Sequence, residues 1–177
     1  MAVRRKHIRT LALALLEKYG IGKAPVDVEK LASMLGANVQ YEPAEDNLSG
    51  FLLRDLNHHR VLIGVNKNHP PQRQRFTIAH ELGHLLLHER EKVYVDHRFQ
   101  LKLRDENASS GISEEEKEAN LFAAELLMPV SLLAQDLAQF DALDLSGDEN
   151  LESLAKKYQV SIQALTFRLA YLNYIQL

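Results

Sequence analysis

Apolar residues recur at helical spacing in the first 36 residues and then change to short runs separated by polar turns. One helical pattern begins near Ile8 and ends at Gly20, and a second extends from Asp27 to Gly36. Asp27 is a good N-cap, and both glycines suit the left-handed conformation that closes a helix. We therefore predict two helices and expect them to pack against each other as a pair.

Three short apolar runs follow, at residues 39–41, 50–53 and 61–65, with a polar turn at 55–59. Runs of this length between turn residues are typical of strands. They predict a small antiparallel sheet. Pro71 then suits the first turn of another helix, because proline lacks only an N–H that would be unsatisfied there.

The helix predicted after Pro71 carries His80, Glu81 and His84 among mostly apolar residues. Histidines four residues apart lie on one helix face and can reach the same metal ion. Glu81 lies between them, where a carboxylate can contact a metal-bound water without being a ligand. The alternative is an amphipathic core helix with surface histidines. Buried histidine and glutamate need partners, however, and a metal ion supplies them.

Gly83 lies inside this predicted helix, where glycine is unfavourable. We expect it to let another backbone approach closely.

The His-Glu-x-x-His spacing is typical of metallopeptidases. The length of 177 residues predicts one domain of ordinary size. Within it we expect the metallopeptidase region at 1–140 and a helix-turn-helix-like hairpin at 141–177 packed on it. The net charge of −3 gives no general attraction to nucleic acid. The chain has no cysteine, so a transition metal must be held by histidine and carboxylate. We find no convincing signal peptide or membrane span and expect a cytoplasmic protein.

A catalytic zinc ion commonly has three protein ligands, so a third must come from elsewhere. The best source is the helix predicted over 113–128, in which Glu116 and Asn120 lie on one stripe. Asn120 is placed to hold a ligating histidine by its other ring nitrogen. Glu115 is the nearest competitor. Ser113 leaves a further alternative, because Ser113-x-x-Glu116 is also a capping box.

A second stripe of the same helix is mainly charged, and we expect it to face water. It comprises Glu114, Glu118, Leu121 and Glu125. His88 continues the row of histidines on the preceding helix. We do not expect it to be a ligand, because three imidazoles in such a row span about 12 Å at 1.5 Å per residue.

Four other histidines fall in predicted turns or loops, where solvated side chains are expected: His58, His59, His69 and His97. One of these, or Tyr94, is a candidate for stabilising the oxyanion. Residues 89–112 are charged and irregular, which is typical of a surface loop or of a lid beside an active site.

The chain resembles the ImmA/IrrE family of metallopeptidases most closely in the two predicted helices that carry the candidate site. The matching segments are residues 73–88 and 116–129, with weaker similarity at 25–32 and 64–66. The resemblance implies an α+β, zincin-like fold in which a small antiparallel sheet packs on the active-site helix, with additional helices and a C-terminal helical hairpin.

By the same resemblance, the metal ligands are His80, His84 and Glu116, the catalytic residue is Glu81, and Asn120 supports a ligand. The ligand set implies Zn²⁺ as the cofactor, although Mn²⁺ and Fe²⁺ also suit a His-His-carboxylate site. Members of the family typically cut a helix-turn-helix repressor and thereby switch on mobile-element or stress-response genes. The implied partner is therefore a protein substrate of that kind.

The pattern at residues 154–169 is typical of a helix-turn-helix, but it offers chiefly Gln163 and Arg168 to bases. The acidic run at 141–152 would repel phosphate. We therefore expect a packing or repressor-docking hairpin and no direct nucleic-acid binding.

Two other functions stay open from the sequence alone. One is a non-catalytic module that binds a repressor and uses the metal only for structure. The other is a DNA-binding regulator that acts through residues 151–173. For the peptidase function, the strand at 50–54 is a candidate to hold substrate by strand addition.

Overall fold

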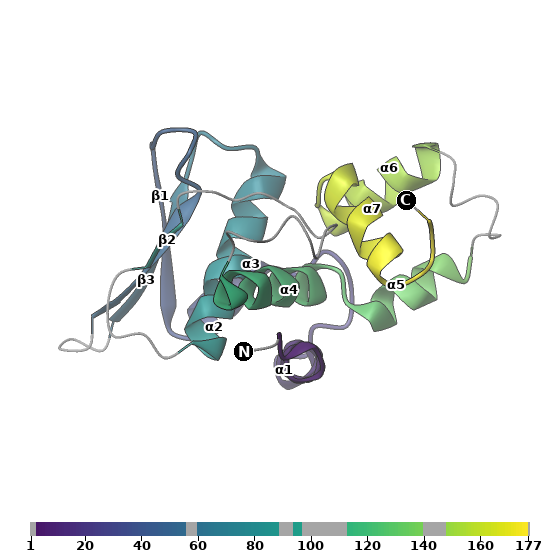
Figure 1. The fold of residues 1–177 in the computed structure, drawn as a ribbon, viewed down its shortest axis with the longest axis horizontal. Helices are drawn as coiled ribbons and strands as arrows, with labels where there is room; N and C mark the ends of the chain where they lie inside the picture. Colours follow the sequence, from purple (N-terminus) through teal and green to yellow (C-terminus); the bar gives the residue numbers. More distant parts are fainter. Residues whose placement is uncertain (1–2, 56–59, 89–93, 97–112, 140–147, 177) are drawn as a thin grey trace.

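The computed structural model of the chain describes residues 3–55, 60–88, 94–96, 113–139 and 148–176. Along these ranges the elements follow in the order α1, α2, β1, β2, β3, α3, β4, α4, α5, α6 and α7, and this grouping of strands and helices confirms the α+β class. The sheet lies at one side with α3 beside it, and α5–α7 lie at the opposite end (Figure 1). No helix in the described ranges is both long and apolar enough to cross a membrane.

The first two helices form where predicted but do not pack as a pair. Helix α1 spans Arg5–Lys18 and helix α2 spans Val28–Met34. The side chain of Asp27 caps α2 by accepting a hydrogen bond from the Lys30 N–H at 3.0 Å. Helix α1 packs chiefly on α4, whereas α2 packs on β1 and α3. The expected pairing was wrong because each helix buries its apolar face against a partner distant in sequence.

Three of the four strands are those predicted, but the sheet is mixed. The strands are β1 (Ala37–Glu42), β2 (Gly50–Asp55), β3 (Arg60–Asn66) and β4 (Tyr94–Asp96), in the spatial order β1-β3-β2-β4. Strand β2 pairs antiparallel with β3 and β4, whereas β1 pairs parallel with β3. The prediction of an antiparallel sheet was therefore wrong for β1.

The loop between β1 and β2 makes this arrangement possible. It carries the chain past β3, so that β2 lies on the far side of β3 from β1. Asn66 holds the loop: its amide donates to the carbonyl oxygens of Glu45 and Leu48 at 3.0 and 2.9 Å. His69 is 6% exposed and contacts the Asp46 carbonyl oxygen at 3.2 Å, so its expected solvation was wrong.

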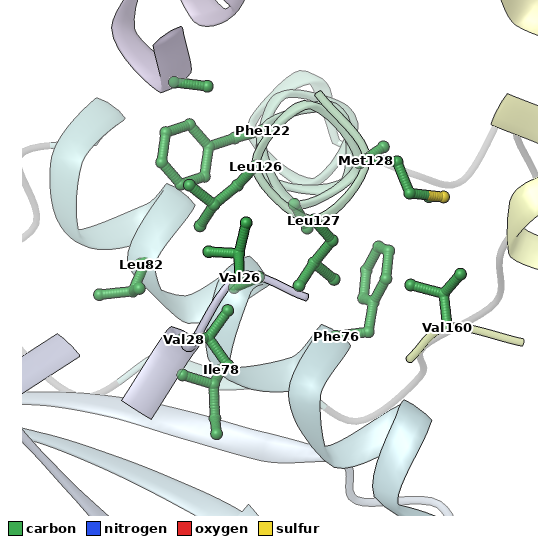
Figure 2. Close-up of a cluster of buried hydrophobic side chains, with 14 of the residues drawn as sticks. Val26, Val28, Phe76, Ile78, Leu82, Phe122, Leu126, Leu127, Met128 and Val160 are labelled. Atoms are coloured by element: carbon green, nitrogen blue, oxygen red, sulfur yellow. The ribbon is translucent and has the colours of Figure 1, made fainter. Parts of the chain in front are cut away.

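Helices α3 (Pro71–Leu87) and α4 (Glu114–Leu127) form the centre of the hydrophobic core. Figure 2 shows the buried Phe76 of α3 beside Leu127 of α4, whereas the buried Ile78 of α3 is drawn farther from α4, next to Val28. Helix α3 also packs against β2 and β3. The sheet and α4 therefore hold α3 on two sides, which buries the residues at its centre.

The last three helices are α5 (Val130–Leu137), α6 (Asp148–Tyr158) and α7 (Ile162–Tyr171). Ser161 caps α7 as the sequence predicts, accepting from the Ala164 N–H at 3.1 Å. Arg168 of α7 is 1% exposed and pairs with Glu125 of α4 at 2.6 Å. The hairpin of α6 and α7 is therefore attached to α4. The predicted boundary at residue 140 lies outside the described residues.

Candidate metal centre

Helix α3 presents three polar side chains from a buried stretch of its surface. His80, Glu81 and His84 are 1%, 0% and 2% exposed. One helical turn separates the two histidines, and their Nε2 atoms lie 3.0 Å apart. Two imidazole nitrogens therefore converge on one point in the protein interior.

Helix α4 brings the carboxylate of Glu116 to the same point. Its Oε2 lies 3.4 Å from His80 Nε2, and its Oε1 lies 3.3 Å from His84 Nε2. One ligand atom from each of the three residues lies within 4.8 Å of the others. The Ser113 hydroxyl accepts from the Glu116 N–H at 3.2 Å, so the helix is capped there. The Glu116 side chain itself is directed to the histidines.

Asn120 fixes the orientation of the His80 ring. Its Oδ1 lies 2.9 Å from His80 Nδ1. Because an amide oxygen only accepts hydrogen bonds, Nδ1 carries the proton and the lone pair of the ring lies on Nε2. That lone pair faces Glu116.

His88 holds the other histidine in a similar way. It follows the last residue of α3, and its Nδ1 lies 3.1 Å from His84 Nδ1. Its Nε2 lies 3.2 Å from Glu118 Oε2. His88 therefore contacts the side of the His84 ring that faces away from Glu116, a role that sequence reasoning missed. The four-residue spacing of His84 and His88 indicates that the two side chains lie next to each other on one helix face, and this pattern could have revealed the contact.

Glu118 and Glu125 are not on a solvated stripe, as the sequence predicted. They are 5% and 3% exposed. Arg4 pairs with Glu118 at 2.5 Å, and Arg9 and Arg168 pair with Glu125 at 3.1 and 2.6 Å. The expectation failed because cations from α7, from α1 and from the residue before α1 meet these carboxylates, which the local pattern does not reveal.

The protonation states suit metal binding. Burial lowers the pKa of His84 to about 4, an effect that Glu116 only partly offsets. Burial alone would raise the pKa of Glu116, but interactions with His80 and His84 outweigh it and bring the pKa to about 2. At neutral pH His84 is therefore a neutral imidazole and Glu116 a carboxylate, which are the forms that bind metal ions.

The arrangement of lone pairs is the strongest fit to a cation. The Nε2 atoms of His80 and His84 and the carboxylate of Glu116 all present acceptors to one another. The Oε1 atom of Glu116 is buried and accepts no hydrogen bond from the described residues. Converging acceptors repel one another unless a positive charge lies among them. Two imidazoles and a carboxylate match the ligand set of a catalytic zinc site.

Gly83 permits the close approach of α3 and α4 that this cluster requires. A methyl group at Gly83 would lie 3.0 Å from the Cα atom and 3.2 Å from the carbonyl oxygen of Ala119. The expected close backbone contact is therefore present. Since Ala119 lies between Glu116 and Asn120 on α4, the contact sets their distance from the histidines.

Arg54 of β2 closes the C-terminal end of α3. Its Nη2 donates to the carbonyl oxygens of His84, Leu85 and His88 at 2.8, 2.9 and 2.8 Å. A cation at the end of a helix also interacts favourably with the helix dipole. The spacing of residues in the sequence gives no sign of this contact.

The remaining candidates divide into those that the structure describes and those that it does not. His58, His59, His97 and most of the segment 89–112 lie outside the described residues. Tyr94 begins β4, and its side chain is likewise outside them. The strand at 50–54 pairs on both sides over part of its length, with β3 and with β4. The first three residues of β2 therefore offer no open edge for a substrate strand.

The fold and the cluster on α3 and α4 define a metallopeptidase domain of the His-Glu-x-x-His type. A sequence profile of the IrrE N-terminal-like domain, peptidase family M78, matches residues 32–170. The chain therefore belongs to the ImmA/IrrE family of metallopeptidases.

Relatives agree with this assignment. The radiation response metalloprotease IrrE of Deinococcus deserti is 30% identical over 172 residues, which cover 96% of this chain and 54% of that protein. The metallopeptidase ImmA of Bacillus subtilis is 31% identical over 116 residues, covering 64% of this chain and 63% of that protein. The chain thus spans less than two thirds of the length of either relative.

A solved structure of a Mycobacterium tuberculosis transcriptional regulator shares the fold. Its TM-score is 0.61 at 16% identity, and the match covers 93% of this chain and 47% of that one. At this identity the likeness concerns the fold alone.

Proposed function

We propose that this chain is a zinc-dependent endopeptidase in which His80, His84 and Glu116 hold the metal ion. The observation that carries the proposal is the convergence of three acceptor groups beside the buried Glu81. A zinc ion bound there supplies a Lewis acid that polarises the scissile carbonyl and acidifies a water molecule. Mn²⁺ and Fe²⁺ suit the same ligands and are alternatives to zinc.

Glu81 is proposed as the general base. Its carboxylate accepts a proton from the attacking water and returns it to the amine that leaves when the peptide bond breaks. Asn120 keeps the proton of His80 on Nδ1, so that Nε2 remains a ligand. Helices α3 and α4 hold these groups in place without rearrangement, because both helices are packed in the core.

The proposed substrate is a helix-turn-helix repressor, cut in the cytoplasm to release genes of a mobile element or a stress response. The resemblance of residues 73–88 and 116–129 to the ImmA/IrrE family supports this substrate. A relative from Bacillus phage phi105, 32% identical over 107 residues, has the name uncharacterized immunity region protein 2, and its origin in a phage supports a mobile-element target.

The alternative functions differ in what they require of the hairpin and of Glu81. Arg168, one of the two polar residues that a recognition helix would offer to bases, is buried against Glu125. Its burial argues against DNA binding through residues 151–173. A repressor-binding module with a structural metal would not need Glu81 as a base.

Glu81→Gln separates these functions. The zinc-loaded protein is incubated with the repressor encoded nearest to it, and new termini are mapped by mass spectrometry. We expect Glu81→Gln to lower the cleavage rate about 10²- to 10⁴-fold while zinc content stays at one ion per chain. Glu114→Gln is the matched control, because that side chain is 41% exposed and pairs with Lys117. Unchanged cleavage by Glu81→Gln would refute the mechanism.

Two further results would favour the alternatives. Full derepression in cells that carry only Glu81→Gln would favour a binding module. Salt-dependent binding of duplex DNA by the purified chain would favour the DNA-binding regulator.

A further inference from the structure

A continuous series of contacts between polar side chains connects His84 to the segment before α1. His84 Nδ1 contacts His88 Nδ1 at 3.1 Å, and His88 Nε2 contacts Glu118 Oε2 at 3.2 Å. Arg4 then holds Glu118 through its backbone N–H at 2.8 Å and its Nε at 3.0 Å. This series of contacts therefore links α3 and α4 to the residue before α1 and ends outside the metal cluster.

Only one pattern of protons satisfies these contacts when both histidines are neutral. The carboxylate of Glu118 accepts hydrogen bonds, so His88 Nε2 carries the proton and donates it. His88 Nδ1 is then an acceptor, and His84 Nδ1 must be the donor. The remaining lone pair of His84 lies on Nε2, which faces Glu116. The contacts thus select the tautomer of His84 that can bind a metal ion.

Arg4 anchors this chain at two points. Besides binding Glu118, its Nη2 donates to the carbonyl oxygen of Leu87 at the end of α3 at 3.1 Å. The guanidinium of Arg4 contacts both carboxylate oxygens of Glu118, because its Nε lies 3.0 Å from Oε1 and 3.1 Å from Oε2. The side chain of Arg4 is 45% exposed, whereas that of Glu118 is 6% exposed. An accessible residue therefore fixes a buried acceptor.

A second arginine–glutamate pair provides a comparison within the same molecule. Arg9 of α1 contacts Glu125 of α4 at 3.1 Å, with side chains 43% and 3% exposed. Exposure and partner type match those of Arg4 and Glu118, but Glu125 leads to Arg168 and to no histidine in the described contacts. Removal of Arg9 thus reproduces the loss of an exposed arginine without touching the histidine chain.

We propose that Arg4, Glu118 and His88 form a positioning relay for His84, through which the segment before α1 sets the metal affinity of the site. His88 orients the ligand, Glu118 orients His88, and Arg4 fixes Glu118. The inference rests on the proposed metal-binding role of His80, His84 and Glu116. None of the three relay residues is itself a ligand or a catalytic residue.

The first test measures metal affinity in His88 variants by competition with a zinc chelator. His88→Phe removes both ring nitrogens, and we expect zinc to bind about 10- to 100-fold more weakly. His88→Asn keeps an oxygen near the position of Nδ1, so it should recover most of that loss. The absorption spectrum of the Co²⁺-loaded protein should change in His88→Phe and remain close to that of the wild type in His88→Asn. A purely structural residue would give no such recovery.

The second test compares Arg4→Ala with Arg9→Ala. We expect Arg4→Ala to weaken zinc binding by about 10-fold or less, because Arg4 acts on His84 only through Glu118 and His88. Arg9→Ala should leave the affinity unchanged, although both variants lose a similar ion pair. Thermal unfolding of the metal-free proteins reports any difference in stability. Since both arginines are exposed on the surface, both variants are expected to fold.

The outcomes distinguish the relay from the site on which it rests. Zinc binding by the wild type that does not depend on His80 and His84 would overturn the proposed site. Tight binding that does depend on them, with the same affinity in His88→Phe, would overturn the relay alone. Equal effects of Arg4→Ala and Arg9→Ala would remove Arg4 from the relay.

Discussion

The two ends of α4 contain the same kind of contact but use it differently. Glu118 and Glu125 are both buried carboxylates, and each binds an arginine from α1 or the residue before it. At one end the contact continues through His88 to a candidate metal ligand. At the other it continues to Arg168 and joins the hairpin to the core. Identical chemistry therefore supports site geometry at one end and fold assembly at the other.

The largest effect is expected at the hairpin end. Arg168→Met leaves the buried Glu125 with only Arg9, and removal of one partner of a buried ion pair typically costs about 3–5 kcal/mol of unfolding free energy. Urea unfolding measures this cost. The double variant Glu125→Met, Arg168→Met should recover much of it. The zinc affinity of folded Arg168→Met should stay near that of the wild type. A loss of zinc affinity as large as that expected for His88→Phe would show that the Glu125 end of α4 also supports the metal site.

Gly83→Ala should lower the free energy of unfolding less than Arg168→Met does, but it should weaken zinc binding more. Its methyl group meets the Ala119 backbone at 3.0 Å. Such overpacking costs about 1–3 kcal/mol, partly offset by about 1 kcal/mol of helix propensity. Since α4 must shift, Glu116 moves from the histidines and zinc binding should weaken, as chelator competition would show.

Gly22→Ala is the matched control for Gly83→Ala, because nothing lies within 4 Å of the added methyl group there. It should leave zinc affinity unchanged. Wild-type affinity in Gly83→Ala would show that the site tolerates a wider separation of α3 and α4.

The helix caps allow a finer comparison of the two regions. Ser113 and Ser161 accept from the backbone N–H three residues later, at 3.2 and 3.1 Å. Alanine at either position should lower the unfolding free energy by about 1 kcal/mol. Only Ser113→Ala should also weaken zinc binding, because Glu116 lies in the turn that Ser113 caps. Similar zinc affinities for the two variants would contradict this distinction.

The smallest effect is expected at Tyr158, whose hydroxyl donates to Asp136 at 2.8 Å. Tyr158→Phe should cost about 0.5–1 kcal/mol, since Lys157 remains with Asp136. Burial and Asp136 raise the pKa of Tyr158, so the folded chain holds the phenolic proton more tightly than the unfolded chain. The advantage of tyrosine over phenylalanine is thus full below pH about 10 and declines above it. Unfolding curves across this range, with zinc affinity unchanged, would show the trend.

Periodicity was sufficient for features that depend on neighbours in sequence. It predicts the boundaries of α1, α2 and α7 to within a few residues, and it places Glu116 and Asn120 on one face of α4. It failed for β1, which pairs parallel, and for the water-facing role of Glu118 and Glu125. Both depend on segments that are far away in the chain, and a local pattern contains no information about them.

The sequence by itself determined which groups can meet on one helix. His80, Glu81 and His84 share a face of α3 because of the helical repeat, and the resemblance to a known family implied their partner on α4. Only the tertiary structure decided how the site is held: the contact of Gly83 with Ala119, the cap that Arg54 places on α3, and the line from Arg4 to His84. The physical reason is the distance along the sequence over which each interaction acts. A helix fixes directions within a few residues, whereas burial and ion pairing depend on which distant surfaces pack together.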